Sequence, residues 1–292
     1  MSANEAWTKF LSDVEQAMQE LDCIELKQDV WFRGLTRSNY DLLPSLFRHF
    51  EKPNLPEGWG QARQLESDLF YEFLARAREA HGPSVSDWDV LFTMQHFRTP
   101  TRLLDWTEVL GIAVYFATLD VVETETKNPP PCVWLLNPCQ LNKISWKFED
   151  VVYPKFLGWK KDKKSYWDYG DLVATLRKVG WKYPVAIFPA QKSPRMHAQR
   201  AWFTIHGDAH IPINAIERIR EKTLRQVKLP YEALPAAREF LKIAGLNHYS
   251  LFPDLENLSA FLKEKYSLVS GAYTTQIVRK TDKGLFRKKK SF

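Results

Sequence analysis

The most constraining feature of the sequence is a nearly all-apolar stretch, VLGIAVYFAT, at residues 109–118. Its composition and length predict a helix with no polar side to expose to water, and such a helix must be packed on most of its sides. A short buried strand that ends in polar groups, residues 101–107, comes directly before it. The chain therefore has to place residues 101–118 inside a packed globular core.

Hydrophobic periodicity along the rest of the chain predicts an alternation of helices and strands. Residues 54–60 are expected to form a loop, and residues 140–183 an irregular insertion rich in basic and aromatic side chains. No internal repeat or clear linker divides the chain, so we predict one α+β domain over residues 1–278 and a disordered basic tail over residues 279–292. The predicted helices cover residues 3–22, 61–80, 86–96, 109–118, 231–244 and 254–266, and the predicted strands cover residues 31–32, 101–107, 132–136, 185–188, 201–205 and 224–229.

The formal net charge of +6 is distributed unevenly along the 292 residues. The tail at residues 279–292 has seven Lys and Arg and one Asp, and residues 140–200 have thirteen Lys and Arg and five Asp and Glu, so the remainder of the chain is acidic. A chain with separate basic and acidic regions suits a polyanion on one side and a basic partner on the other.

Several classes of protein are not indicated by the sequence. The N-terminus lacks the basic and apolar regions of a signal peptide, and no apolar run approaches the roughly 20 residues of a membrane helix. We therefore expect a cytoplasmic protein with no membrane partner. The three cysteines have no zinc-like spacing, and His206 and His210 have no evident third ligand nearby, so no metal site is expected.

Three short stretches place polar side chains at the ends of predicted strands: residues 31–34, 95–107 and 195–203. In the first, Arg33 is either a surface arginine beside a turn or an anion clamp, since a guanidinium offers a rigid fork of donors and the following Gly34 lets a ligand approach the backbone. Asp105 is either a helix cap or a site carboxylate, and Gln199 is either a surface residue or part of a site. Taken singly, the three stretches leave these alternatives open.

Taken together, the three stretches resemble the FRG-domain family, which is named for its Phe-Arg-Gly signature. The signature is present at residues 32–34, the distinctive stretch TRLLDWT lies at residues 101–107, and LFPDLE at residues 251–256 is similar to a late motif of the family. The resemblance covers about residues 20–266. The chain departs from it at Phe97-Arg98, where the family usually has a Tyr-Gly pair.

The order of these motifs also looks like that of ADP-ribosyltransferases, which implies a mixed or split β-sheet with flanking helices and NAD as the co-substrate. Those enzymes have an Arg at the end of a first strand, a Ser/Thr-bearing strand before an apolar helix, and a Glu on a later strand. Arg33, residues 101–107 and Gln199 match these positions here, although Gln199 is neutral and Asp105 is the nearby motif carboxylate that can replace a Glu. The catalytic residues that the resemblance implies are Arg33, Asp105, Thr107 and Gln199, and the NAD-binding residues are Arg33, Gly34, Trp31, His96, Thr101, Arg102 and Trp106.

The basic and aromatic insertion suggests an acceptor for the transfer. It interleaves aromatic residues, which can stack on unpaired bases, with lysines, which can neutralise phosphates, and this combination is typical of single-strand binding. An ordinary solvated insertion is the alternative interpretation. The residues expected to contact nucleic acid are Lys160, Lys161, Lys163, Lys164, Trp159 and Trp167.

These features favour an NAD-dependent ADP-ribosyltransferase that modifies RNA or single-stranded DNA. Such an enzyme would be toxic to its host, so its expected role is that of the toxin in an antiphage toxin–antitoxin system, with an antitoxin protein as its partner. Three alternatives stay open: a non-enzymatic FRG module that binds a nucleotide or nucleic acid, a protein ADP-ribosyltransferase, and a component whose basic tail docks on an acidic partner.

Overall fold

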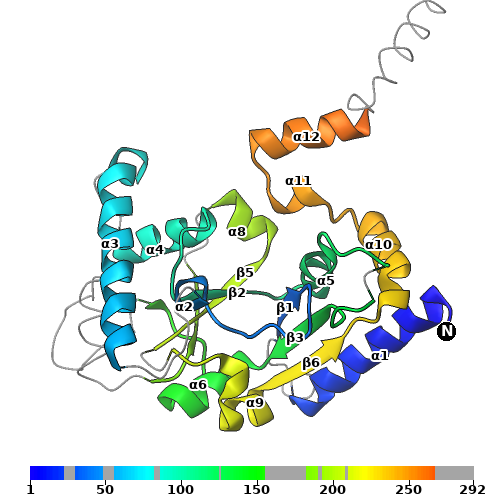
Figure 1. Ribbon diagram of the computed structural model, residues 1–292, viewed down its shortest axis with the longest axis horizontal. Coiled ribbons are helices and arrows are strands. Elements are labelled where there is room, and N and C mark those ends of the chain that lie inside the picture. The colour runs from blue at the N-terminus through cyan, green and yellow to red at the C-terminus, as the bar shows by residue number, and fades with distance from the viewer. Residues whose placement is uncertain are drawn as a thin grey trace, which may run out of the picture.

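Figure 1 shows the computed structural model, in which helices pack on both faces of a six-stranded sheet. The structure describes residues 1–22, 30–48, 56–81, 86–124, 126–154, 182–189, 193–207 and 210–266. The strands are β1 Trp31–Leu35, β2 Leu103–Thr107, β3 Cys132–Leu136, β4 Val185–Ile187, β5 Ala201–Ile205 and β6 Leu224–Lys228. The helices are α1 Ala3–Glu20, α2 Ser45–Arg48, α3 Pro56–His81, α4 Asp87–His96, α5 Leu110–Thr118, α6 Pro138–Trp146, α8 Pro194–Ala198, α9 Glu217–Thr223, α10 Leu234–Ile243, α11 His248–Leu251 and α12 Leu255–Lys265, with short 3-10 turns at Ile213–Ala215 and Tyr231–Ala233.

The sheet has the strand order β4-β5-β2-β1-β3-β6, and each neighbouring pair is antiparallel. Most pairs are in register along the whole strand; β1, for example, pairs with β3 from Trp31 to Leu35. The pairing of β1 with β2 is much shorter, because Phe32–Thr107 is the one registered pair within these two fully described strands. The sheet therefore has a weakly bonded seam in its middle, between β1 and β2.

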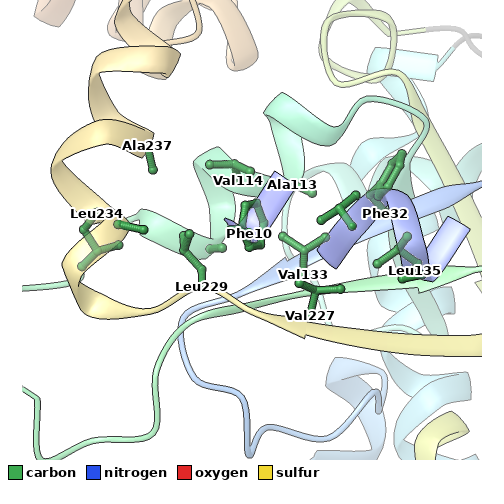
Figure 2. Close-up of a cluster of buried hydrophobic side chains, with 14 of the residues drawn as sticks. Phe10, Phe32, Ala113, Val114, Val133, Leu135, Val227, Leu229, Leu234 and Ala237 are labelled. Atoms are coloured by element: carbon green, nitrogen blue, oxygen red, sulfur yellow. The ribbon is translucent and has the colours of Figure 1, made fainter. Parts of the chain in front are cut away.

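One core lies between the sheet and the helices α1, α5 and α10, as Figure 2 shows. Side chains alternate between the two faces of a strand, so Phe32 of β1 and Val133 of β3 point to this side, where Phe10 of α1 and Val114 of α5 also lie. Full burial of a Val, Leu, Ile or Phe side chain stabilises the fold by roughly 1.5–3 kcal/mol. Most residues of α5 are buried, as their apolar composition predicts.

Gly34 sets how closely α5 can approach β1. A Cβ atom at this position would lie 1.8 Å from the backbone oxygen of Ala113 and 2.7 Å from the backbone nitrogen of Ala117. Any residue other than glycine would therefore push the helix away from the strand. Helix packing explains this glycine, and its role in NAD binding stays a prediction.

Two further cores complete the packing. On the same face of the sheet, α3, α4 and α8 cover β2, β4 and β5, and the rings of Phe92 and Phe203 meet there. On the opposite face, α6 and α9 cover several tryptophans, among which Trp31 stacks on Trp202. The first face is thus covered by two groups of helices, and the boundary between these groups follows the seam between β1 and β2.

The α+β class and the positions of the predicted strands are confirmed. Helix α4 is capped by Ser86, whose side chain accepts a hydrogen bond from the N–H of Asp89 at 3.2 Å. Gly245, with a φ of +69°, follows the end of α10 as its sequence position indicates.

Three predictions about the fold are wrong. Residues 56–60 belong to α3 rather than to a loop, since proline is tolerated in a first helical turn and glycines lower helix propensity without forbidding a helix. Residues 140–146 lie in α6, whose start signal, the Asn137 cap followed by Pro138, was hidden by the basic and aromatic composition around it. Of the predicted mixed or split sheet, the mixed form is wrong, because every pair of named strands is antiparallel.

The greater part of the predicted insertion, residues 155–181, and the whole tail at residues 279–292 lie outside the described residues. The division into one domain at residues 1–278 and a tail stays a prediction.

The substitution Gly34→Ala should lower the free energy of unfolding by about 3 kcal/mol, because the new methyl group would overlap the backbone of α5. Urea denaturation measures this loss. Gly245→Ala is the control: the φ of +69° strains an alanine at this position, but no atom lies within 4 Å of the added Cβ, so a loss of about 1 kcal/mol is expected. Equal losses in the two variants would contradict the packing role of Gly34.

Candidate functional site

Asp105 is an exposed carboxylate at the seam. It lies in the middle of β2, where its side chain is 51% exposed while the residues on either side of it in the strand are buried. Its carboxylate is held from the end of α4, where Nε2 of Gln95 donates to Oδ2 of Asp105 at 2.8 Å. The N-cap of α5 is Val109, so Asp105 does not act as the helix cap that was one of its two interpretations.

Arg33 reaches Asp105 from the neighbouring strand. Nη1 of Arg33 donates to the backbone oxygen of Asp105 at 2.6 Å and lies 3.7 Å from Oδ2 of its carboxylate. The side chain is 18% exposed; burial lowers the pKa of the guanidinium, and the charge of Asp105 opposes this effect. Arginine nevertheless stays protonated in proteins, so the seam holds a cation and an anion side by side. Where the two strands no longer pair, the guanidinium supplies a hydrogen bond across the seam.

Thr101 fixes the geometry of Gln95. The hydroxyl of Thr101 donates to Oε1 of Gln95 and accepts from the N–H of Leu103 at 3.1 Å. The amide of Gln95 is thereby oriented with its oxygen toward Thr101 and its NH2 group toward the Asp105 carboxylate. Thr101 is buried, so it contributes to the site through Gln95.

Thr107 and Gln199 form a second group at the end of β2. The hydroxyl of Thr107 donates to the carbonyl of Gln199 at 2.8 Å, and the side chain of Gln199 donates to the carbonyl of Leu251 at 3.0 Å. These bonds tie β2 to the segments that follow α8 and form α11. In the described part of the chain, no hydrogen bond or ion pair joins this group to the pair at the seam. The four predicted catalytic residues therefore fall into two separate pairs.

Arg102 holds α3 against the sheet. Its Nε donates to Oε1 of Glu66 at 2.6 Å, its Nη2 bonds the other oxygen of Glu66, and its Nη1 donates to the carbonyl of His206 at 2.9 Å. Both charged side chains are almost completely buried. Removing one partner of a buried pair costs about 3–5 kcal/mol, because the other charge is left without compensation. The structure thus gives Arg102 a structural role that was not expected from the sequence.

The two tryptophans predicted to bind NAD, Trp31 and Trp106, are buried as well. Trp31 stacks on Trp202 with ring centroids 4.9 Å apart, and Nε1 of Trp106 donates to the hydroxyl of Thr204 at 3.1 Å. Both rings lie in the core on the opposite face of the sheet, so neither presents a free face to a ligand in this structure.

His96 is partly accessible at the end of α4. Its Nδ1 lies 3.3 Å from the hydroxyl of Ser193, and its carbonyl accepts from Nη1 of Arg195 at 2.6 Å. Burial lowers the pKa of His96, and the positive charge of Arg195 lowers it further. Of the side chains predicted to bind NAD, Arg33 and His96 are the partly accessible ones.

Gln95 and Arg195 belong to the site although the sequence did not assign them a role. Arg195, at the start of α8, lies within electrostatic range of Asp105, whose charge raises its pKa against the effect of burial. Both residues occur in the polar stretches noted in the sequence. Their partners come from other elements of the fold, however, and no local spacing indicates such contacts.

The pair at the seam can bind an anionic group through Arg33 and stabilise a developing positive charge through Asp105. Among the described residues, no group of three or more His, Cys, Asp or Glu is placed to hold a metal ion. The residues predicted to contact nucleic acid, which are Lys160, Lys161, Lys163, Lys164, Trp159 and Trp167, lie outside the described residues.

Comparison with known proteins identifies one part of the chain. Residues 28–126, about a third of the chain, match the family model of the FRG domain, which supports the resemblance to that family. The match includes Arg33, Gln95 and Asp105 and ends before Arg195, so it is shorter than the resemblance over residues 20–266. No curated protein and no solved structure matches the chain. Each helix in the described ranges is too short or too polar to cross a membrane.

His206, next to Arg102, should make the stability of the protein depend on pH. Among the described residues neither ring nitrogen of His206 has a hydrogen-bond partner, and burial, followed by the charge of Arg102, lowers its pKa to about 3. The unfolded chain takes up a proton at this residue below about pH 6.5. Stability should therefore fall as the pH drops from about 6.5 toward about 3, and the loss should reach about 2 kcal/mol near pH 5.

The variant His206→Phe keeps an aromatic ring near Phe47 and removes the titrating group. Chemical denaturation at neutral and at acidic pH should show a smaller acid-induced loss of stability in the variant than in the wild type. The same loss in both proteins would assign the acid sensitivity to other groups.

Proposed function

We propose that the protein is an NAD-dependent ADP-ribosyltransferase whose acceptor is a single-stranded nucleic acid. The observation that carries the proposal is the pair at the seam, in which Nη1 of Arg33 lies 3.7 Å from the exposed carboxylate of Asp105. Arg33 offers a fork of donors for the diphosphate or for the nicotinamide ribose. Asp105 supplies the negative charge that the neutral Gln199 lacks.

In this reaction, the bond between C1′ of the ribose and the nicotinamide nitrogen breaks, and its electron pair leaves with nicotinamide. The ribose becomes oxocarbenium-like, and a fixed carboxylate near C1′ stabilises that charge. A nucleophilic atom of the acceptor then bonds to C1′ and releases its proton to a base or to water. Gln95 holds the carboxylate of Asp105 by a hydrogen bond of 2.8 Å, so little reorganisation is needed during the reaction.

The sheet lends further support to the proposal. The motif order implies a split sheet, and β1 and β2 share one registered pair. Arg33 and Asp105 lie on the two sides of this seam. A ligand bound across the seam would contact the guanidinium from one strand and the carboxylate from the other.

The acceptor and the biological role are proposed from the sequence. Residues 140–200 contain thirteen Lys and Arg against five Asp and Glu, interleaved with aromatic residues, which suits an unpaired strand. An enzyme that modifies nucleic acid in its own cell is toxic. We therefore place it as the toxin of an antiphage toxin–antitoxin system, restrained by an antitoxin protein.

The test of the proposed reaction is incubation with NAD labelled in its adenylate part and with RNA, single-stranded DNA or cell protein. Label in nucleic acid supports the proposal, and label in protein alone would replace the acceptor. NAD binding without transfer to any of the three would favour a non-enzymatic nucleotide-binding module, the alternative that the neutral Gln199 suggests.

The substitution Asp105→Asn should reduce transfer by about a hundredfold or more, because the amide lacks the charge that stabilises the oxocarbenium-like ribose. The side chain is exposed and keeps an oxygen for Gln95, so the melting temperature should not change. Asp41→Asn is a matched control, since Asp41 also accepts from a side-chain amide, that of Asn214, at 3.0 Å. A fully active Asp105→Asn enzyme would remove Asp105 from the catalytic assignment.

The substitution Arg33→Ala should weaken NAD binding by about tenfold or more, because charge-assisted bonds to phosphate oxygens are lost. The variant should still fold, with a loss of about 1–2 kcal/mol for the hydrogen bond across the seam. Calorimetric titration with NAD measures the affinity, and Arg37→Ala, which removes an arginine that lies over Tyr40 after the same strand, serves as the control. Unchanged affinity in folded Arg33→Ala would restrict Arg33 to a structural role.

A further inference from the structure

Arg98 has a backbone conformation that arginine rarely adopts. It follows Phe97, the residue at which α4 ends, and its φ is +63°, in the left-handed region that favours glycine. Helices often end with glycine in this conformation. It is strained for an arginine, and the guanidinium of Arg98 contacts a ring from a distant segment of the chain.

Two guanidinium groups converge on the ring of Phe252. The guanidinium of Arg98 lies 5.9 Å from the ring centroid, and that of Arg195 lies 4.5 Å from it. Phe252 is buried, so its ring is a fixed support for both cations. Arg195 is also held by the hydrogen bond from its Nη1 to the His96 carbonyl at 2.6 Å.

Within the described part of the chain, the two guanidinium groups have no carboxylate partner. Neither Arg98 nor Arg195 forms an ion pair with any acidic residue of the described ranges. Burial lowers the pKa of Arg195, the charge of Asp105 opposes this, and the charge of Arg98 lowers it further. Asp254 is also within electrostatic range of Arg195, but its carboxylate accepts two hydrogen bonds from Asn257, at 2.8 and 2.6 Å, at the start of α12. An anion bound between the guanidinium groups would compensate their repulsion.

Phe97 adds an aromatic face beside these cations. It is 67% exposed and makes an edge contact with His96, with the ring centroids 4.7 Å apart. An exposed ring next to unpaired cations is the combination with which proteins bind single-stranded nucleic acid, because bases stack on the ring while the cations neutralise phosphates.

We propose that Arg98 and Arg195, supported by Phe252, bind a phosphate of the acceptor strand and that Phe97 stacks on a neighbouring base. This inference deepens the proposed function and rests on its nucleic-acid acceptor. Arg195 lies within electrostatic range of Asp105, so the subsite and the carboxylate at the seam influence each other's charge.

The variant Arg98→Gly tests the subsite without endangering the fold, because it introduces the residue that this backbone conformation favours. The affinity for a short single-stranded RNA is measured over a salt series without NAD. We expect about tenfold weaker binding at about 0.1 M salt and a salt slope smaller by about one, as for the loss of one phosphate contact. The melting temperature should be unchanged or higher.

Arg200→Gly is the matched control. Arg200 also has a positive φ, 46°, but its guanidinium pairs with Glu108 at 3.3 Å, so the variant makes the same change of charge and backbone at an arginine that already has a carboxylate partner. Phe97→Ala tests the aromatic face separately, and it should weaken RNA binding without changing the salt slope.

A loss of RNA affinity in Arg98→Gly that is absent from Arg200→Gly supports the subsite. Equal losses of RNA affinity in the two variants would mean that net charge alone matters. If Arg98→Gly binds ADP-ribose more weakly but RNA as well as the wild type does, the guanidinium pair belongs to the dinucleotide site. Either result overturns the inference, as does a wild-type protein that binds no RNA at low salt. Transfer of label from NAD is measured separately, so failure of the proposed reaction is distinguishable from failure of the subsite.

Discussion

The contact between α5 and β1 at Gly34 is the constraint on which the site depends. The apolar composition of α5 forces the helix into the core. Because Gly34 has no side chain, the backbone of α5 can lie where the Cβ of residue 34 would otherwise be. The same helix follows β2 directly along the chain, so its position also fixes the end of β2. One packed helix thus sets the placement of both strands of the seam, with Arg33 next to Gly34 on one side and Asp105 on the other.

Local patterns in the sequence account for much of the fold and for the pair at the seam. Short buried runs predicted β2, β3 and β5, and the Phe-Arg-Gly and TRLLDWT stretches brought Arg33 and Asp105 into one hypothesis. The alternation of side chains along a strand contained one more signal: Asp105 and Trp106 are adjacent in β2, so their side chains leave the strand on opposite faces of the sheet.

Contacts between distant segments could not be predicted in this way. Glu66 and Arg102 lie on different elements of the fold. Charged residues are usually exposed, and the sequence does not show that these two pair in the interior. The order of contacts from Thr101 through Gln95 to Asp105 similarly depends on how the end of α4 meets the seam. In both cases the decisive term is the cost of leaving a polar group buried without a partner, and this cost is known only once the fold brings the groups together.

The FRG domain match, at residues 28–126, contains Arg33 and Asp105 but not Arg195 or Phe252. Under the proposed function, the matched part therefore supplies the groups that act on NAD, whereas the anion subsite is completed by segments from the second half of the chain. Arg98 lies inside the match, yet its guanidinium rests on the ring of Phe252 from that second half. Its left-handed backbone destabilises the fold by about 1–2 kcal/mol. Under the proposed function, the contact of its guanidinium with a phosphate of the acceptor would offset this cost.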